Sequence, residues 1–274
     1  MNSARTKAKK QAGANGHPAI VTYSDPGALA PQQDAATGMQ NLATSAITEG
    51  PSSSPNFVDG GGPVIRNVQV QLIFWGQVWN NLANPTVEQV TQAVSSILAG
   101  TYMSALRQYR NIGSGRLIGQ TIVSQASAHA AADPPNPFSA GNIVALLIDL
   151  IHAKTVAQPN PQVLYVVILP ARVLSSQFNV VGEHFFFPLD GHNVHYAWVT
   201  NDGSLDTVTT RFSHELVEAV TDPEGTGIHG TLDNDKQSGL FEIVDACQGD
   251  TTVINGVAVQ KYFSQKDGIC VVGS

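Results

Sequence analysis

The chain has 274 residues, of which 42% are hydrophobic and 13% are charged, so it is long enough for one large domain or two small ones. Its net charge is −7, and four of its 14 basic residues lie within the first ten positions. Because the rest of the chain has no basic stripe for phosphate groups, no nucleic-acid partner is predicted for it; the short basic segment at the start is the one part that could contact phosphate groups. The longest near-continuous apolar run, Ile143 to Ile151, is about half the roughly 20 residues needed to span a bilayer, so no membrane span is predicted.

The first 63 residues show no periodicity and are rich in Ala, Gly, Ser, Pro and Gln. Such a segment buries too little apolar surface to offset the entropy that is lost when it is ordered. We therefore predict a disordered N-terminal tail or pro-segment over residues 1–63 and a single domain over residues 64–274. No apolar h-region follows the basic start, so no ordinary signal peptide is visible and a cytoplasmic location is not excluded.

From Val64 onward the chain alternates between strand and helix patterns. The segment NVQVQLIFW has the period-2 pattern of a strand, and Thr86 and Gln89 then form a capping box before a helix that ends at Gly100. The next predicted elements are a short helix at 102–109, a strand at 117–123, a helix at 143–152, a central strand at 163–169 and a strand at 194–200. This alternation predicts an α/β or α+β domain in which helices flank a mixed sheet.

The segment SLDTVTTRFSHELVEAVTDPEG predicts a further helix over about residues 205–221. Ser204 is a good N-cap, and Pro223 follows the C-terminal end. On a helical wheel the apolar residues of this segment fall on one arc, which is the expected core face. His214 and Glu218 lie on the opposite side of the helix.

The helix motif HELVE has the residue types and spacing of a metal site. His214 and Glu218 can reach one cation because residues at i and i+4 project from the same face. Glu215 then lies beside the metal, where it can take a proton from a bound water. This is the logic of the H-E-x-x-H metalloprotease helix, with Glu218 in place of the second histidine. The alternative is a surface helix whose solvent-facing side happens to carry these residues.

Further candidate ligands lie far from this helix in the sequence. Glu242 and Asp245 are three residues apart in a partly apolar segment, where buried carboxylates need a cation or hydrogen-bond donors. Either one could complete a three-ligand site with an open position for water, and a solvated pair of acids is the alternative. Four of the eight histidines fall within 31 residues: His184, His192, His195 and His214.

The ion itself is not fixed by these residue types. A histidine and glutamate pair is a harder ligand set than two histidines, so calcium or manganese is credible beside zinc. The two cysteines also have two interpretations. A Cys247–Cys270 bridge would close a loop of about 23 residues and contribute about 3 kcal/mol if unstrained, and two buried thiols are the alternative.

Five ordered motifs give residues 62–274 a resemblance to the phosphate-induced protein 1 family, which includes the plant EXORDIUM-like proteins and bacterial relatives. The motifs are GGPVIRNVQVQLIFWG, GEHFFFP, YAWVTN, SHELVEAVTDP and EIVDACQG. The resemblance implies an EXORDIUM-like domain, an extracellular or cell-wall-associated location and the Cys247–Cys270 disulfide. It marks seven positions that match the family pattern and does not support His192 or His195. The seven are His184, His214, Glu215, Glu218, Glu242, Asp245 and Cys247.

Together the motifs predict a metal-dependent hydrolase of zincin-like design, a zinc metallopeptidase that acts on a peptide or cell-wall-associated substrate. Glu215 would activate water, while His214, Glu218 and one of Glu242, Asp245 or His184 would hold the ion. The sequence leaves the oligomeric state open.

Two alternative functions remain open from the sequence. The first is a non-catalytic extracellular or cell-wall-associated protein, involved in growth or host interaction, that uses the same residues for a structural ion. The second is carbohydrate binding, suggested by Trp75, Trp79 and the aromatic run Phe185 to Phe187.

Overall fold

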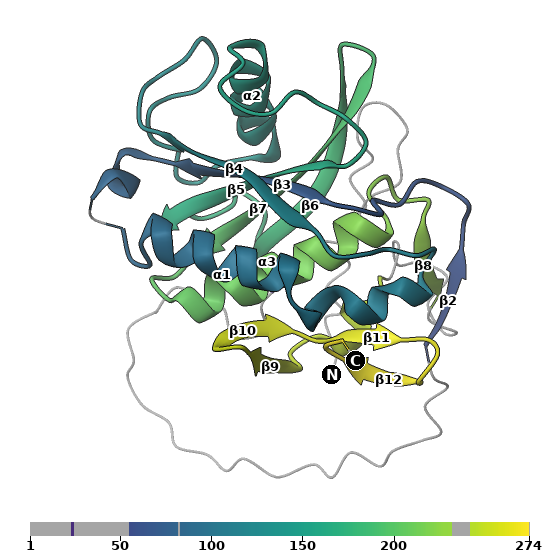
Figure 1. The fold of residues 1–274 in the computed structure, drawn as a ribbon. Helices are drawn as coiled ribbons and strands as arrows, with labels where there is room; N and C mark the ends of the chain where they lie inside the picture. Colours follow the sequence, from purple (N-terminus) through teal and green to yellow (C-terminus); the bar gives the residue numbers. More distant parts are fainter. Residues whose placement is uncertain (1–22, 25–54, 82, 232–241, 274) are drawn as a thin grey trace, which may run out of the picture.

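The computed structural model describes residues 23–24, 55–81, 83–231 and 242–273. Its centre is a mixed six-stranded sheet with helices on both faces (Figure 1), which confirms the predicted fold class. The strand order is β1-β6-β7-β5-β3-β4, in which β4, β3, β5 and β7 are parallel and β6 runs antiparallel to β7. The strands are β1 (Tyr23–Ser24), β3 (Gln69–Trp75), β4 (Arg116–Val123), β5 (Val163–Ala171), β6 (Val180–Leu189) and β7 (His192–Asn201).

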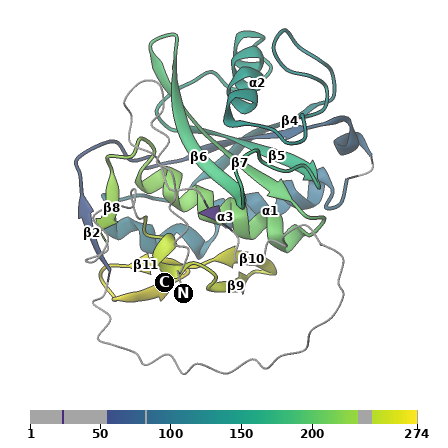
Figure 2. The same cartoon turned by 180° about the vertical axis from the view of Figure 1, so that it is seen from behind.

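Among the described residues, three α-helices cover the sheet. They lie on both of its faces (Figures 1 and 2). They are α1 (Val87–Ala99) and α3 (Leu205–Thr221) on the first face, and α2 (Ala140–His152) on the second. The predicted capping box at the start of α1 is present, since the Thr86 and Gln89 side chains each accept the other's backbone N–H. None of the helices in these described ranges is both long and apolar enough to cross a membrane.

Because both faces of the sheet are covered, its central strands are apolar on both sides. Residues 163–170 of β5 are all buried, as the run of β-branched residues predicts. In β3, Leu72 packs into the core beneath α1 and α3, and its neighbour Ile73 packs into the second core beneath α2. The sheet is therefore a rigid platform for the residues that project from it toward α3.

Short elements complete the domain around α1 and α3. The predicted helix at 102–109 is a 3-10 helix, and two C-terminal hairpins lie beyond α3 on the side away from the sheet (Figure 2). The 3-10 helices are η1 (Gln77–Asn80), η2 (Thr101–Gln108) and η3 (Asp245–Cys247). The small strands are β2 (Asn56–Asp59), β8 (Ile228–Thr231), β9 (Thr251–Ile254), β10 (Val257–Gln260), β11 (Tyr262–Ser264) and β12 (Ile269–Val271).

The predicted start of order at Val64 is wrong, because structure begins earlier in the chain. Strand β2 pairs antiparallel with β8, and the N–H groups of Gly60 and Gly62 donate to the carbonyls of Gly227 and Thr226, both at 2.7 Å. The two residues of β1 also pair antiparallel with β6. The backbone partners of residues 56–62 all come from the segment after α3, a pairing that no local pattern reveals. The rest of the predicted tail lies outside the described residues.

Candidate metal centre

The helix that carries the HELVE motif has the predicted bounds, Leu205–Thr221. Ser204 occupies the N-cap position, but its side chain makes no capping hydrogen bond, contrary to the prediction. The carboxylate of Asp202, two residues before Ser204, makes the hydrogen bonds at this end of the helix instead. It accepts the N–H of Ser204 at 2.9 Å and the hydroxyl of Thr207 at 2.9 Å.

The side of α3 opposite the apolar arc is buried, so the alternative of a surface helix with HELVE facing solvent is wrong. Every residue from Arg211 to Pro223 is buried. The reason is that α3 lies between the sheet on one side and β10 on the other, with α1 alongside (Figures 1 and 2). Because HELVE is not a solvated surface motif, its ionisable side chains must be stabilised by each other or by a ligand.

His214 lies one helical turn from Glu218, as the i, i+4 spacing predicts. Its Nε2 atom is 3.0 Å from Glu218 Oε1 and 3.7 Å from Asp245 Oδ1, which belongs to η3. Burial lowers the pKa of His214 to about 4, although the nearby Asp245 carboxylate opposes this shift. The ring is therefore neutral near pH 7, which is the form that binds metal ions.

His184 approaches Glu218 from β6, where it faces Ala197 of β7 across the strand pair. Its Nε2 atom is 3.3 Å from the carbonyl oxygen of Asp222, and a carbonyl can only accept, so Nε2 carries the proton in this hydrogen bond. In the neutral ring Nδ1 then holds the lone pair, and it lies 3.1 Å from Glu218 Oε2. A lone pair facing a carboxylate oxygen at this distance requires a proton or a cation between the two atoms.

The structure brings all five predicted ligands together in two overlapping groups. The first is His184, Glu218 and Glu242, and the second is His214, Glu218 and Asp245. Within each group the candidate ligand atoms all lie within 4.8 Å of one another. These buried groups could hold a metal ion, and Glu218 belongs to both.

Glu242 and Asp245 are held in a tight local turn. Asp245 Oδ2 accepts the backbone N–H of Glu242 at 3.1 Å, and the Asp245 N–H donates to the Glu242 carbonyl at 3.1 Å. Cys247, at the end of η3, forms the expected disulfide with Cys270 of β12. The bridge therefore ties the segment that supplies both carboxylates to the C-terminal hairpin.

The buried carboxyl groups resist ionisation in the absence of a cation. Burial raises the pKa of Glu215, Glu218 and Glu242 well above their usual range, and repulsion from the nearby Asp245 carboxylate adds to the effect in all three. Burial also raises the pKa of Asp245, although His214 opposes that shift. A divalent cation would reverse this balance, because it stabilises the ionised form of every carboxylate that contacts it.

Glu215, the predicted proton acceptor, lies beside the two groups. Its Oε2 atom is 3.8 Å from His184 Nδ1, and neither of its oxygens accepts a hydrogen bond from an N–H or hydroxyl group of another described residue; its side-chain hydrogen bond is to the carboxyl of Glu218. A methyl group added at Gly182 of β6 would overlap the Glu215 carboxylate. Gly182, the first residue of the GEHFFFP motif, therefore leaves space for this side chain. No local pattern indicates this role, because no strand is predicted over this segment.

Several other candidates lie outside the cluster. His195 Nε2 contacts Glu224 Oε1 at 3.0 Å, and His192 is exposed, so neither belongs to the two groups. Trp75 and Trp79 are buried, with 1% and 3% exposure, so they offer no stacking surface for a sugar ring.

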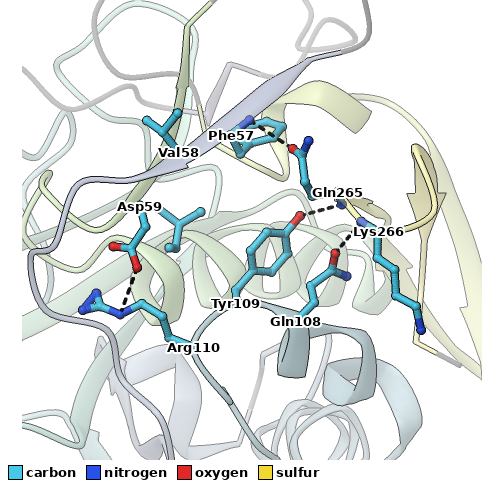
Figure 3. Close-up of a pocket in the computed structure, with 9 residues that line it drawn as sticks. Phe57, Val58, Asp59, Gln108, Tyr109, Arg110, Gln265 and Lys266 are labelled. Atoms are coloured by element: carbon cyan, nitrogen blue, oxygen red, sulfur yellow. Dashed lines mark hydrogen bonds and ion pairs between the residues drawn. The ribbon is translucent and has the colours of Figure 1, made fainter.

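A separate surface pocket lies between β2, η2 and the turn after β11 (Figure 3). Among the described residues that line it there is no histidine, and its carboxylate, Asp59, pairs with Arg110 at 3.5 Å. The backbone N–H of Gln265 donates to the Tyr109 hydroxyl at 3.0 Å, which joins the two sides of the pocket. The described residues that line this pocket include no set of metal-binding side chains.

Comparison of the chain with models of known protein families, with curated proteins and with solved structures found no match.

Proposed function

We propose that this protein is a metal-dependent hydrolase, specifically a zinc metallopeptidase of zincin-like design. The single observation that supports it best is the convergence of two histidines and four carboxyl groups from β6, α3 and the segment 242–245 in one cluster. Imidazole and carboxylate donors are the ligands of catalytic zinc sites, and calcium or manganese remains compatible with the carboxylates. The relationship to the phosphate-induced protein 1 family, which the five sequence motifs suggest, is part of this proposal.

Each residue of the cluster has a role in the proposed reaction. His214 and Glu218, with Asp245 or with His184 and Glu242, would hold the ion, which lowers the pKa of a bound water and polarises the substrate carbonyl. Glu215 would accept a proton from that water. A raised pKa suits this role, since a general base works best when its pKa lies near the pH of the reaction.

A peptide is the substrate class that the sheet favours. Strand β6 carries His184, and its outer edge pairs antiparallel with Tyr23–Ser24, with Tyr23 opposite Gly182. The edge of β6 therefore accepts an extended backbone directly beside the glycine that faces Glu215. This placement also supports a pro-segment role for the N-terminal region, since β1 occupies the position that a substrate strand would take.

A non-catalytic protein with a structural ion is the second candidate, and the burial of the cluster favours it. Exposure is 0% for His214 and Glu218 and 1% for His184, Glu215 and Glu242. Structural metal sites are closed in this way, whereas catalytic sites keep a position open for water. The disulfide is compatible with the extracellular location that the family resemblance implies.

Substitution of Glu215 by glutamine separates these two functions. We expect the variant to keep the metal content of the wild type and to lose at least about 100-fold in peptide hydrolysis, because its amide cannot accept the proton. Hydrolysis is measured on a peptide library by mass spectrometry, before and after limited proteolysis of the N-terminal segment. The matched control is Glu224→Gln, since Glu224 pairs with His195 outside the cluster. Metal-loaded wild-type protein without activity in either state would favour the structural ion.

A further inference from the structure

The two carboxylate oxygens of Glu218 face different histidines. Oε2 lies 3.1 Å from His184 Nδ1, and Oε1 lies 3.0 Å from His214 Nε2. The histidines come from different elements, β6 and α3, and each contacts a different oxygen of the carboxylate. A carboxylate presented in this way can bridge two cations, which stand about 3.5–4 Å apart in two-metal sites.

Each of the two histidines also has a second carboxylate in its group. Glu242 completes the group on the His184 side, and Asp245 completes the group on the His214 side. The 3.7 Å between His214 Nε2 and Asp245 Oδ1 is too long for a hydrogen bond. It suits two donors on one zinc ion, because bonds of about 2.0–2.2 Å place tetrahedral ligands about 3–4 Å apart.

Buried oxygens without hydrogen bonds point to missing partners inside the cluster. Glu242 is 1% exposed, and neither of its carboxylate oxygens accepts a hydrogen bond from an N–H or hydroxyl group within the described part of the chain; its side-chain hydrogen bond is to the carboxyl of Glu218. Glu218 Oε1 is likewise buried and accepts none from the N–H and hydroxyl groups of those residues. Buried carboxylates are stabilised by donors or by cations, so oxygens without donors mark the positions where a cation would bind.

The charge of the cluster also suits two ions. Four carboxyl groups (Glu215, Glu218, Glu242 and Asp245) surround the two histidines. When all four are ionised and both rings are neutral, one divalent cation balances half of the negative charge and two balance all of it. Asp222, at the end of α3, is partly stabilised separately, because its Oδ1 accepts the N–H of Gly227 at 2.5 Å.

We propose that the cluster is a dinuclear metal centre bridged by Glu218. One divalent cation is held by His184 and Glu242, and the other is held by His214 and Asp245. The inference rests on the proposed function for its premise that the cluster binds metal, and it extends that function from one ion to two. Glu215 lies beside the His184 side of the centre, where it can act on a water that the two ions share.

Zinc stoichiometry tests the inference in the full-length chain. The protein is stripped with a chelator and titrated with Zn²⁺ alone, and bound ions are counted by native mass spectrometry. Two ions per chain are expected. One ion per chain would overturn the dinuclear centre and leave the metal-dependent hydrolase standing, whereas no bound zinc would overturn both.

Single substitutions locate the two ions. His184→Ala and His214→Ala are each expected to retain one zinc ion, because each removes a ligand from one side of the bridge. The matched control, His195→Ala, is expected to retain two, since His195 lies on β7 and contacts Glu224 instead. Two ions in either cluster variant would overturn the assignment. Circular dichroism shows whether each variant is folded.

A spectroscopic test in the wild type does not depend on any variant. Loaded with Mn²⁺ alone, the protein should give the spin-coupled electron paramagnetic resonance spectrum of two ions that share a carboxylate. A spectrum of isolated Mn²⁺ at saturating metal would overturn the bridge.

Discussion

Replacing Glu218 by glutamine is expected to weaken zinc binding more than any other single substitution in the protein. Glu218 contacts both histidines and belongs to both ligand groups, and the amide keeps its shape but loses its charge. Outer-shell partners of metal ligands are typically worth 10- to 100-fold in affinity, so loss of a shared ligand should exceed about 100-fold. Isothermal titration calorimetry with Zn²⁺ measures this change.

The same substitution should make the metal-free protein more stable. Burial raises the pKa of Glu218, which means that its ionised form is destabilising when no cation is present. A neutral amide removes that penalty, and the free energy of unfolding measured in chelator should rise by about 1–3 kcal/mol. The control is Glu224→Gln, which should change neither property. If Glu218→Gln binds zinc as tightly as the wild type does, the assignment of Glu218 as a ligand is wrong.

The second large effect concerns the dependence of stability on pH. Zinc is expected to reverse the sign of this dependence between about pH 6.5 and 8. In the metal-free protein the pKa values of Glu215, Glu218 and Glu242 are raised in the folded state, so folding takes up protons above the unfolded pKa of about 4.3. Stability is then lost as pH rises from the unfolded pKa toward the raised pKa of the folded state. The slope is about 1.4 kcal/mol per pH unit for each carboxyl that is protonated only in the folded chain.

His214 acts in a different pH range. Its folded pKa of about 4 is below the unfolded value of about 6.5, so it costs stability only as pH falls below about 6.5. Zinc reverses the carboxylate contribution, because its ligands must be deprotonated and its affinity increases with pH. Urea unfolding at pH 6.5, 7.25 and 8 should therefore show stability falling with pH in chelator and rising in saturating zinc. Slopes of the same sign in both conditions would contradict this account.

The local part of the site could be predicted from the sequence. Capping residues and apolar spacing predict the bounds of α3, and the i, i+4 rule places His214 and Glu218 within contact of one cation. Such features depend on residues a few positions apart, for which helical geometry fixes the distances. The period-2 and β-branched patterns predict β3 and β5 for the same reason.

The environment of the site could not be predicted in this way. A helical wheel separates apolar from polar faces, but it does not show that β10 covers α3 on the side away from the sheet. Strand β6 was not predicted as an element, because GEHFFFP has no alternation of polar and apolar residues, although His184 faces α3 from it. The early order at β2 and the position of Gly182 likewise depend on partners distant in the sequence.

Anomalous X-ray scattering at the zinc edge, from crystals grown with zinc, tests the central claim most directly. We expect anomalous peaks inside the cluster, within about 2.0–2.2 Å of a histidine nitrogen and a Glu218 oxygen. Carboxyl groups hydrogen-bonded to one another or to water, with no anomalous peak among His184, His214 and Glu218 at saturating zinc, would contradict it.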